Sequence, residues 1–187
     1  MSTAVSMKRG GEASPFFKAR IAGLFYLLTF LTGGLALFVS GKLGSAAGLS
    51  AGACYIAVTL LFYGIFKPVN RNLSLLAAFI SLAGIVMGPL SLLHIVPSNL
   101  NPLVFFGFYC ILIGYLIFRS TFLPRILGAL MAFGGLGWLT FLAPPLANHL
   151  FPYNLAPGIL GEGALTLWLL VMGVNVQRWR EQASGSG

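Results

Sequence analysis

The sequence predicts an all-α, polytopic membrane protein with six transmembrane helices. Of its 187 residues, 58% are hydrophobic and 7% are charged, whereas a soluble domain carries about a quarter charged residues. A helix needs roughly 20 apolar residues to cross a bilayer, and six runs of about that length follow one another along the chain. Six crossings would occupy most of the chain, so no separate soluble domain is expected.

The six expected helices are separated by loops of only a few residues. They occupy residues 20–39, 46–66, 73–96, 102–118, 124–143 and 156–176. Short loops make consecutive helices antiparallel neighbours, so we expect three antiparallel hairpins in a helical bundle. Pro102, Pro124 and Pro157 stand at or near helix starts, where the missing amide hydrogen costs nothing.

Basic residues indicate the orientation of these helices. Ten of the eleven lysines and arginines flank the apolar runs on one side of the membrane, and only Lys42 falls on the other. Under the positive-inside rule both termini are cytoplasmic. Residues 1–19 and 178–187 are then polar cytoplasmic segments, and residues 20–177 form the transmembrane domain. The first apolar run is too long for the core of a signal peptide, so we expect it to be retained.

The same distribution explains the formal net charge of +8. Nucleic acid, the usual partner of a strongly basic soluble protein, is not expected here. Membrane lipids are the expected partners, because basic residues beside a membrane are attracted to anionic headgroups.

The shortage of acidic residues excludes several enzyme classes. Aspartate is absent, and the only acids are Glu12, Glu162 and Glu181, so paired-aspartate proteases, aspartyl-phosphate ATPases and two-carboxylate glycosidases are excluded. Neither a P-loop nor an HExxH motif is present. Cys54 and Cys110 lie inside apolar runs and are expected to be buried free thiols. We therefore predict no catalytic residue and no cofactor.

Small residues and prolines suggest how the helices pack. Gly44, Gly48 and Gly52 repeat every four residues, which predicts a flat stripe for close helix packing or, as an alternative, for a homodimer. Seven of the ten prolines belong to the half of the molecule away from the basic residues. Among them, Pro89 and the pair at 144–145 predict kinks around an outward-facing cavity.

Glu162 is the one charged residue whose position topology does not explain. It lies about two turns into the last apolar run, where an ionised carboxylate is costly, so it should face the bundle. An intramembrane acid is a functional candidate, and the alternative is a structural carboxyl near a helix N-terminus. A zinc site with His94 and His149 would have suitable ligand types, but the spacing matches no recognised pattern, so no metal is predicted.

Aromatic residues of the fourth run offer a surface for an apolar ligand. Phe105, Phe108 and Tyr109 are expected on one helix face, where they could stack on a flat or isoprenoid molecule or simply pack in the core. With the polar residues of the outer side they complete the predicted ligand-binding set, which consists of Glu162, His94, Asn101, Phe105, Tyr109 and His149.

Ser50 lies in the string Gly48-Leu-Ser50-Ala-Gly52, which matches the GxSxG motif of serine hydrolases. That motif needs a strand-to-helix turn, which the sequence does not predict. The four-residue glycine spacing explains the string without catalysis.

Four strings of the sequence resemble an uncharacterised family of small bacterial integral membrane proteins, domain of unknown function 4386. They are KPVNRNLSLLAAF at 67–79, FFGFY at 105–109, FRSTFLPR at 118–125 and WLLVMGVNVQ at 168–177. The resemblance extends over residues 19–182 and implies a bacterial inner-membrane location. It assigns no activity and no site residue.

These observations rank three functions. The first is a non-enzymatic bundle that binds a small apolar or lipid-like molecule in an extracytoplasmic-side cavity, or serves a larger membrane complex as an accessory subunit. The second is a proton- or ion-coupled transporter with Glu162 as its titrating group. The third is an intramembrane hydrolase with Ser50 or Glu162 beside a histidine.

Overall fold

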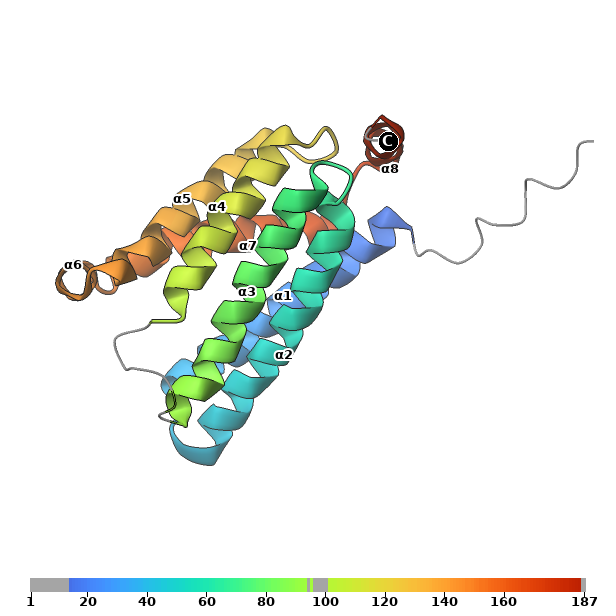
Figure 1. Cartoon of the computed structure of the whole chain (residues 1–187). Helices are drawn as coiled ribbons and strands as arrows, with labels where there is room; N and C mark the ends of the chain where they lie inside the picture. Colours follow the sequence, from blue (N-terminus) through green and yellow to red (C-terminus); the bar gives the residue numbers. More distant parts are fainter. Residues whose placement is uncertain (1–13, 94, 96–100, 186–187) are drawn as a thin grey trace, which may run out of the picture.

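The computed structural model describes residues 14–93, 95 and 101–185, and all regular structure in them is helical (Figure 1). The α-helices are α1 (Pro15–Phe38), α2 (Gly41–Phe66), α3 (Arg71–Leu92), α4 (Leu103–Arg119), α5 (Arg125–Leu139), α6 (Pro144–Leu150), α7 (Ala156–Val171) and α8 (Val176–Ser184). Two 3₁₀ turns, Thr140–Leu142 and Tyr153–Leu155, flank α6. The predicted all-α fold is confirmed for these residues.

Five helical stretches are long and apolar enough to cross a membrane. They are Pro15–Ala36, Gly41–Phe66, Arg71–Leu90, Arg125–Leu142 and Tyr153–Val171. Helix α4 is apolar but has only 17 residues, which at 1.5 Å per residue span about 26 Å. These five stretches indicate a multi-pass membrane protein, and the sixth crossing stays a prediction.

Six helices pack in a closed ring. Helix α1 contacts α2 and α7, and the remaining contacts join α2 to α3, α3 to α4, α4 to α5 and α5 to α7 (Figure 1). Helices α1 and α2 run in opposite directions, because a Cβ at Gly33 of α1 would contact Ala51 of α2 and one at Gly48 of α2 would contact Ala36 of α1. Because α1 contacts α7, the first and last long helices lie side by side.

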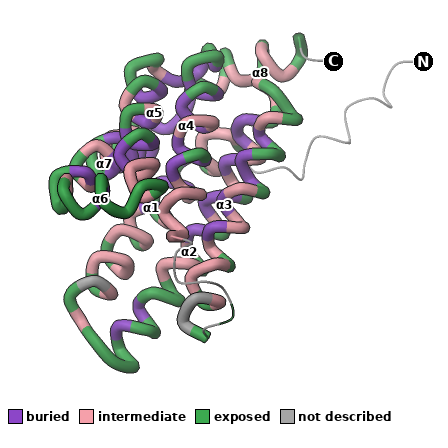
Figure 2. Tube along the Cα trace, turned by 60° about the vertical axis from the view of Figure 1, so that its left-hand side comes forward, coloured by how far each residue is buried: buried purple, intermediate pink, exposed green. Residues whose placement is uncertain are grey.

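The buried core occupies one part of the ring (Figure 2). Ala19, Ala22 and Tyr26 of α1 are buried, and no described side chain of α1 after Tyr26 is. On α2 most buried side chains lie between Tyr55 and Phe66. The core therefore extends from the end of the ring that carries α8 to the level of Tyr26 and Tyr55.

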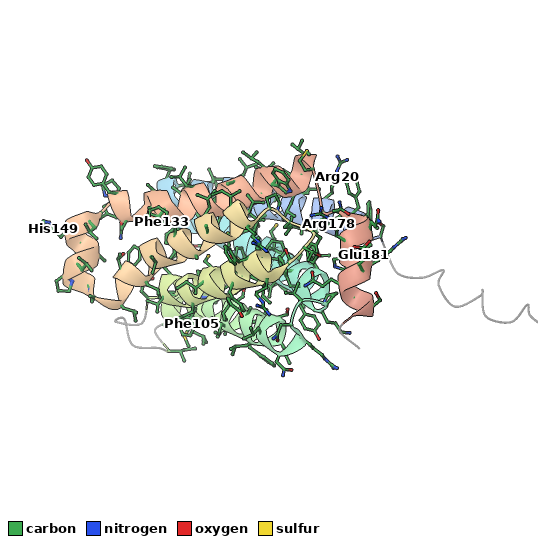
Figure 3. The ribbon with its side chains drawn as sticks, turned by 90° about the horizontal axis from the view of Figure 1, so that it is seen from above. Arg20, Phe105, Phe133, His149, Arg178 and Glu181 are labelled. Atoms are coloured by element: carbon green, nitrogen blue, oxygen red, sulfur yellow. The ribbon has the colours of Figure 1, made fainter. Side chains whose placement is uncertain are left out.

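The two ends of the bundle differ in charge (Figure 3). Arg20, Arg178 and Glu181 lie at the end that carries α8, and His149 lies at the other. The Arg20 guanidinium donates to the carbonyl oxygen of Val171 at 3.0 Å, which joins the start of α1 to the end of α7.

The proline pair at 144–145 acts differently from the prediction. Helix α3 continues through Pro89 to Leu92, and the pair at 144–145, expected to kink the end of the fifth helix, instead begins α6. Proline suits the first helical turn because the amide hydrogens there have no intrahelical acceptor.

The C-terminal segment is helical, although it was predicted as a polar tail. Helix α7 ends at Val171, and Gly173 has φ +64°, a left-handed conformation that glycine adopts without strain. The chain then forms α8, which the Asn175 side chain caps by accepting from the Arg178 amide. The Trp179 indole donates to the Ile65 carbonyl oxygen at 2.8 Å and fixes α8 to the end of α2.

Helices α4 and α5 pack closely, backbone against backbone. A Cβ atom at Gly114 would lie 2.7 Å from the Gly128 carbonyl oxygen, and one at Gly135 would lie 2.7 Å from the Gly107 carbonyl oxygen. We call Gly107, Gly114, Gly128 and Gly135 the glycine seam. The predicted stripe on α2 packs more loosely against other helices, because added Cβ atoms at Gly48 and Gly52 would lie 3.8 and 3.6 Å from their nearest neighbours. A Cβ at Gly44 would instead overlap the Val39 carbonyl oxygen just before the helix. Seven-residue spacing on α4 and α5, rather than four-residue spacing on α2, marks the close approach.

Candidate functional site

Glu162 on α7 is buried at the lower limit of the core, with 7% of its surface exposed. Its Oε2 accepts a hydrogen bond from the Tyr26 hydroxyl at 2.7 Å, and its Oε1 accepts one from the Trp138 indole at 2.7 Å. The Cys110 thiol lies 3.7 Å from Oε1. The prediction that Glu162 faces the bundle is confirmed, and each carboxyl oxygen has a strong donor.

A hydrogen bond and a ring contact extend the group from Glu162 and Tyr26 to α2 and α4. The Tyr26 and Tyr55 hydroxyl oxygens are 3.3 Å apart, and the Tyr55 ring meets the Tyr109 ring with 5.9 Å between centroids. We call these residues the Glu162 cluster: Glu162, Tyr26, Tyr55, Tyr109, Cys110 and Trp138. The cluster takes side chains from five of the six helices of the ring.

Two glycines on α7 bring Trp138 to the carboxyl. A Cβ atom at Gly158 would overlap the Trp138 indole, and one at Gly161 would overlap the Leu130 carbonyl oxygen. Because neither residue has a side chain, α7 approaches α5 closely. This approach places the indole within hydrogen-bonding distance of Glu162.

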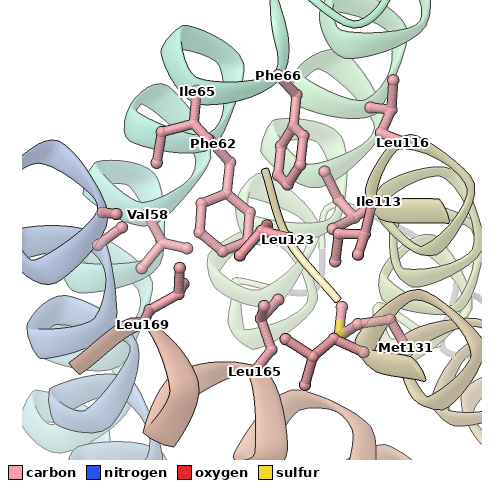
Figure 4. Packing of buried hydrophobic residues seen from close by; sticks show 14 of the residues in the cluster. Val58, Phe62, Ile65, Phe66, Ile113, Leu116, Leu123, Met131, Leu165 and Leu169 are labelled. Carbon is pink, nitrogen blue, oxygen red and sulfur yellow. The ribbon is translucent and has the colours of Figure 1, made fainter. Parts of the chain in front are cut away.

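Apolar side chains fill the space between the cluster and the α8 end (Figure 4). Phe62 of α2 packs edge-on against Tyr26 with centroids 5.9 Å apart, and Met131 and Leu165 are completely buried beside it in the same core. The cluster is therefore closed on its basic side by tightly packed hydrocarbon.

Tyr109 has an unused hydroxyl. The side chain is 1% exposed, and its hydroxyl, although beside Thr59, has no hydrogen-bond partner of acceptable geometry among the described residues. The Thr59 hydroxyl is instead 2.7 Å from the Ser81 hydroxyl and 2.9 Å from the Tyr55 carbonyl oxygen. Leaving a buried hydroxyl unpaired costs free energy, so this group is available to a water molecule or a ligand.

The structure brings together two of the predicted ligand-binding residues, Glu162 and Tyr109. Phe105 packs towards α3, since a Cβ atom added at Gly84 of α3 would lie 2.8 Å from the Phe105 Cβ. The Asn101 side chain accepts from the Leu103 amide at 2.9 Å and thereby helps to start α4. His149 is exposed on α6 (Figure 3), and His94 lies outside the described residues.

The predicted aromatic face of α4 needs correction. Phe108 is 45% exposed while Tyr109 is buried, so the two do not share one face. Phe106, three residues before Tyr109, instead packs edge-on against Tyr55 with centroids 4.9 Å apart. Residues three apart lie on one side of a helix. Phe106 and Tyr109, rather than Phe105 and Phe108, therefore face the interior of the bundle.

Sequence reasoning missed most partners of Glu162. Cys110 was expected only as a buried apolar residue, and Tyr26 and Tyr55 were not singled out. One signal was present: Tyr26 and Tyr55 stand well inside apolar runs, whereas membrane tyrosines usually gather at the interfaces. A tyrosine in the middle of a span needs a buried hydrogen-bond partner.

Neither metal nor serine chemistry gains support. Within the described ranges, no three His, Cys, Asp or Glu side chains could hold a metal ion together. Ser50 is exposed, and its hydroxyl donates to the Ala46 carbonyl oxygen one turn earlier. That bond is usual for a serine within a helix.

Comparison with known proteins supports the resemblance seen in the sequence. Residues 97–173 match the model of a family described as "Domain of unknown function (DUF4386)". This segment holds α4 to α7, and with them Glu162, Trp138, Cys110 and Tyr109. Tyr26 and Tyr55 lie outside it.

A protein of Archaeoglobus fulgidus named "Uncharacterized protein" is 27% identical over 127 residues, which are 63% of this chain and 76% of that protein. No solved structure matches the chain. The resemblance to domain of unknown function 4386 is therefore confirmed over residues 97–173, the segment that supplies the carboxyl of the cluster and three of its partners.

Proposed function

We propose that the chain crosses the cell inner membrane six times as three hairpins, with both termini in the cytoplasm. The support is the gathering of basic residues at the end that carries α8. Arg119 ends α4, Arg125 begins α5 and Arg71 begins α3, while Lys42 lies at the start of α2. Labelling of single cysteines in a variant without Cys54 and Cys110 tests this topology. An impermeant reagent added to intact cells should label Lys42→Cys but not Arg180→Cys.

We further propose that the bundle binds a small, uncharged and largely apolar molecule at the Glu162 cluster. The observation that carries this proposal is the buried Tyr109 hydroxyl, which lies beside Thr59 and the Glu162 cluster but makes no hydrogen bond of its own within the described residues. A donor of this kind recognises a carbonyl, ether or hydroxyl oxygen. The surrounding rings of Tyr55 and Phe106 would contact the apolar part of such a molecule.

Access to the cluster would come from the half of the bundle opposite α8. Described α1 side chains beyond Tyr26 are half-buried or exposed, and the Cβ-to-neighbour distances at Gly33 and Gly48 are 3.8 Å, in ordinary contact. The basic side is closed by the hydrophobic core. Two surface hollows lie at the α8 end, and a cavity near Glu162 stays a prediction.

Mass spectrometry of the purified protein tests the binding proposal. The full chain, extracted in a mild detergent, should carry a non-covalent adduct in its native mass spectrum. Tyr109→Phe should lower the adduct fraction about threefold to tenfold, the loss expected for one hydrogen bond. Tyr115→Phe is the matched control, because Tyr115 lies on the same helix but is half exposed. A wild-type protein without an adduct, or equal adducts in all three proteins, would contradict the proposal.

A proton-coupled transporter is the second candidate, favoured by the chain of hydrogen bonds from Glu162 through Tyr26 to Tyr55. Such a chain of oxygen atoms can pass protons between helices. Glu162→Gln should abolish a pH-dependent flux in proteoliposomes, and Tyr26→Phe should reduce it. Flux that is unchanged in Glu162→Gln would dismiss this candidate.

A further inference from the structure

A hollow at the α8 end is lined by three arginines. It has a volume of about 400 Å³ and lies between the loop joining α4 to α5 and the first turn of α8. Its lining includes Arg119, Arg125 and Arg178, together with Ser120, Thr121 and Pro124. Arg119 is the last residue of α4 and Arg125 the first of α5, so the hollow lies where two apolar helices reach the membrane surface.

Two of the three guanidinium groups are held in place by the protein. Arg178 donates to the Thr121 carbonyl oxygen at 3.3 Å, and the Arg125 guanidinium lies 5.6 Å from the centre of the Phe118 ring. The loop is itself fixed to α8, because the Thr121 amide donates to the Gln182 side chain at 3.1 Å. The charges are therefore gathered by a folded loop rather than spread on mobile segments.

These positive charges have little compensation. In the described residues the carboxylates are Glu162 and Glu181, and Glu162 is buried in its own cluster. Glu181 lines the adjoining hollow with Arg178 but accepts from the Gln177 side chain at 3.1 Å. No ion pair within 4.0 Å joins the three arginines to a carboxylate of the described chain. Glu181 is therefore the one described carboxylate near the three guanidinium groups, and it lies in the adjoining hollow.

We infer that this hollow binds the headgroup phosphate of an anionic phospholipid. Arginine binds phosphate through paired, charge-assisted hydrogen bonds. The apolar surface beside the hollow suits acyl chains, since Phe118 is 50% exposed and Ile126 is 63% exposed on the adjoining turns of α4 and α5. A free phosphate ion has no acyl chain and would make no contact with this apolar surface. The site is independent of ligand binding at Glu162.

Native mass spectrometry with defined lipids tests the inference. The full chain in detergent is titrated with phosphatidylglycerol, with phosphatidylcholine and with inorganic phosphate. The triple variant Arg119→Gln, Arg125→Gln, Arg178→Gln should bind phosphatidylglycerol at least about tenfold more weakly than the wild type. The matched control is Lys67→Gln, Arg71→Gln, Arg180→Gln, which removes three exposed charges from the same end outside the hollow and should change binding less than about threefold.

Each outcome has a fixed meaning. Preferential binding of phosphatidylglycerol that only the first triple variant loses supports the site. Equal losses in the two variants would show a diffuse charge effect and overturn it, as would equal affinity for phosphatidylcholine. Displacement of the lipid by inorganic phosphate at similar concentration would make free phosphate the ligand and also overturn it. Thermal unfolding in detergent without added lipid checks that the variants fold, and Arg125→Gln alone serves if the triple variant does not.

Discussion

The α4–α5 and α1–α2 pairs are both antiparallel and adjacent in sequence, yet they pack by different means. In the glycine seam of α4 and α5, backbone meets backbone, and added Cβ atoms at Gly114 or Gly128 would lie 2.7 and 2.6 Å from the opposing carbonyl oxygens. Between α1 and α2 the buried contacts include aromatic edges, such as Tyr26 on Tyr55 with centroids 5.4 Å apart. One interface requires missing side chains and the other requires particular side chains.

This difference separates the backbone packing that stabilises the bundle from the side-chain contacts that can rearrange within it. Inside lipid the hydrophobic effect does not drive apolar helices together, so close backbone packing stabilises the bundle. Side-chain contacts of the α1–α2 kind can rearrange by rotation about single bonds. We therefore expect the glycine seam to be the rigid part of the ring and the tyrosines to be the adjustable part.

The largest expected effect is that of Gly114→Ala. The new methyl group would meet the Gly128 carbonyl oxygen and the Ala132 amide within 2.8 Å, and overpacking of this kind costs about 2–3 kcal/mol. Unfolding by sodium dodecyl sulfate in mixed micelles measures the loss. Gly64→Ala is the control, because no atom lies within 4 Å of an added Cβ there. Equal stability of the two variants would refute the rigid seam.

The next largest effect should come from Glu162→Gln. The glutamine side chain keeps one acceptor oxygen but turns an amide donor towards Tyr26 or Trp138, both of which are donors to the carboxyl. A buried donor without an acceptor costs about 1–2 kcal/mol, measured by the same unfolding assay. If the variant is as stable as the wild type, the cluster does not hold the helices together.

Two tyrosines on the adjustable side should respond differently. Tyr26→Phe loses a bond to Glu162 and should cost about 0.6–1 kcal/mol, the usual value for a hydrogen bond between membrane helices. Tyr109→Phe removes a hydroxyl without a partner in the described residues and should leave the stability of ligand-free protein unchanged. A larger loss for Tyr109→Phe than for Tyr26→Phe would reverse the assignment.

The smallest effect is expected for Gly48→Ala. An added Cβ would be 3.8 Å from Ala36, which is ordinary contact, so the unfolding free energy should change by less than about 1 kcal/mol. A loss as large as that of Gly114→Ala would restore the α2 glycine stripe as a packing face and remove the contrast between the two interfaces.

The sequence predicts the helices well because length and hydropathy decide them. Apolar runs match five spans closely, and the burial of Glu162 follows from the cost of an acid facing lipid. Helix ends were less predictable. The last run was expected to continue to Val176, but a left-handed Gly173 ends it and the polar segment beyond folds as α8. The docking of Trp179 on Ile65 and the hydrogen bonds between Thr121 and Gln182 explain why a tail of that length is ordered against the bundle.

The partners of Glu162 could not be predicted, because they depend on which helices become neighbours. Tyr26 is 136 residues from Glu162 in sequence, and no periodicity relates the two. The glycine seam escaped for a similar reason. A seven-residue spacing is significant only when an opposing helix carries the same spacing in antiparallel register, as Gly107 and Gly114 do with Gly135 and Gly128.

The closed ring has a consequence for how the protein is made. Helix α7 is synthesised after the helices that carry Tyr26 and Trp138, yet it supplies the carboxyl to which both of these groups donate. Until α7 inserts between α1 and α5, the nascent bundle is an open arc whose polar side chains await their acceptor. We therefore expect the ring to close when its last long helix inserts, and the hydrogen bonds to Glu162 then hold α1 and α5 in register.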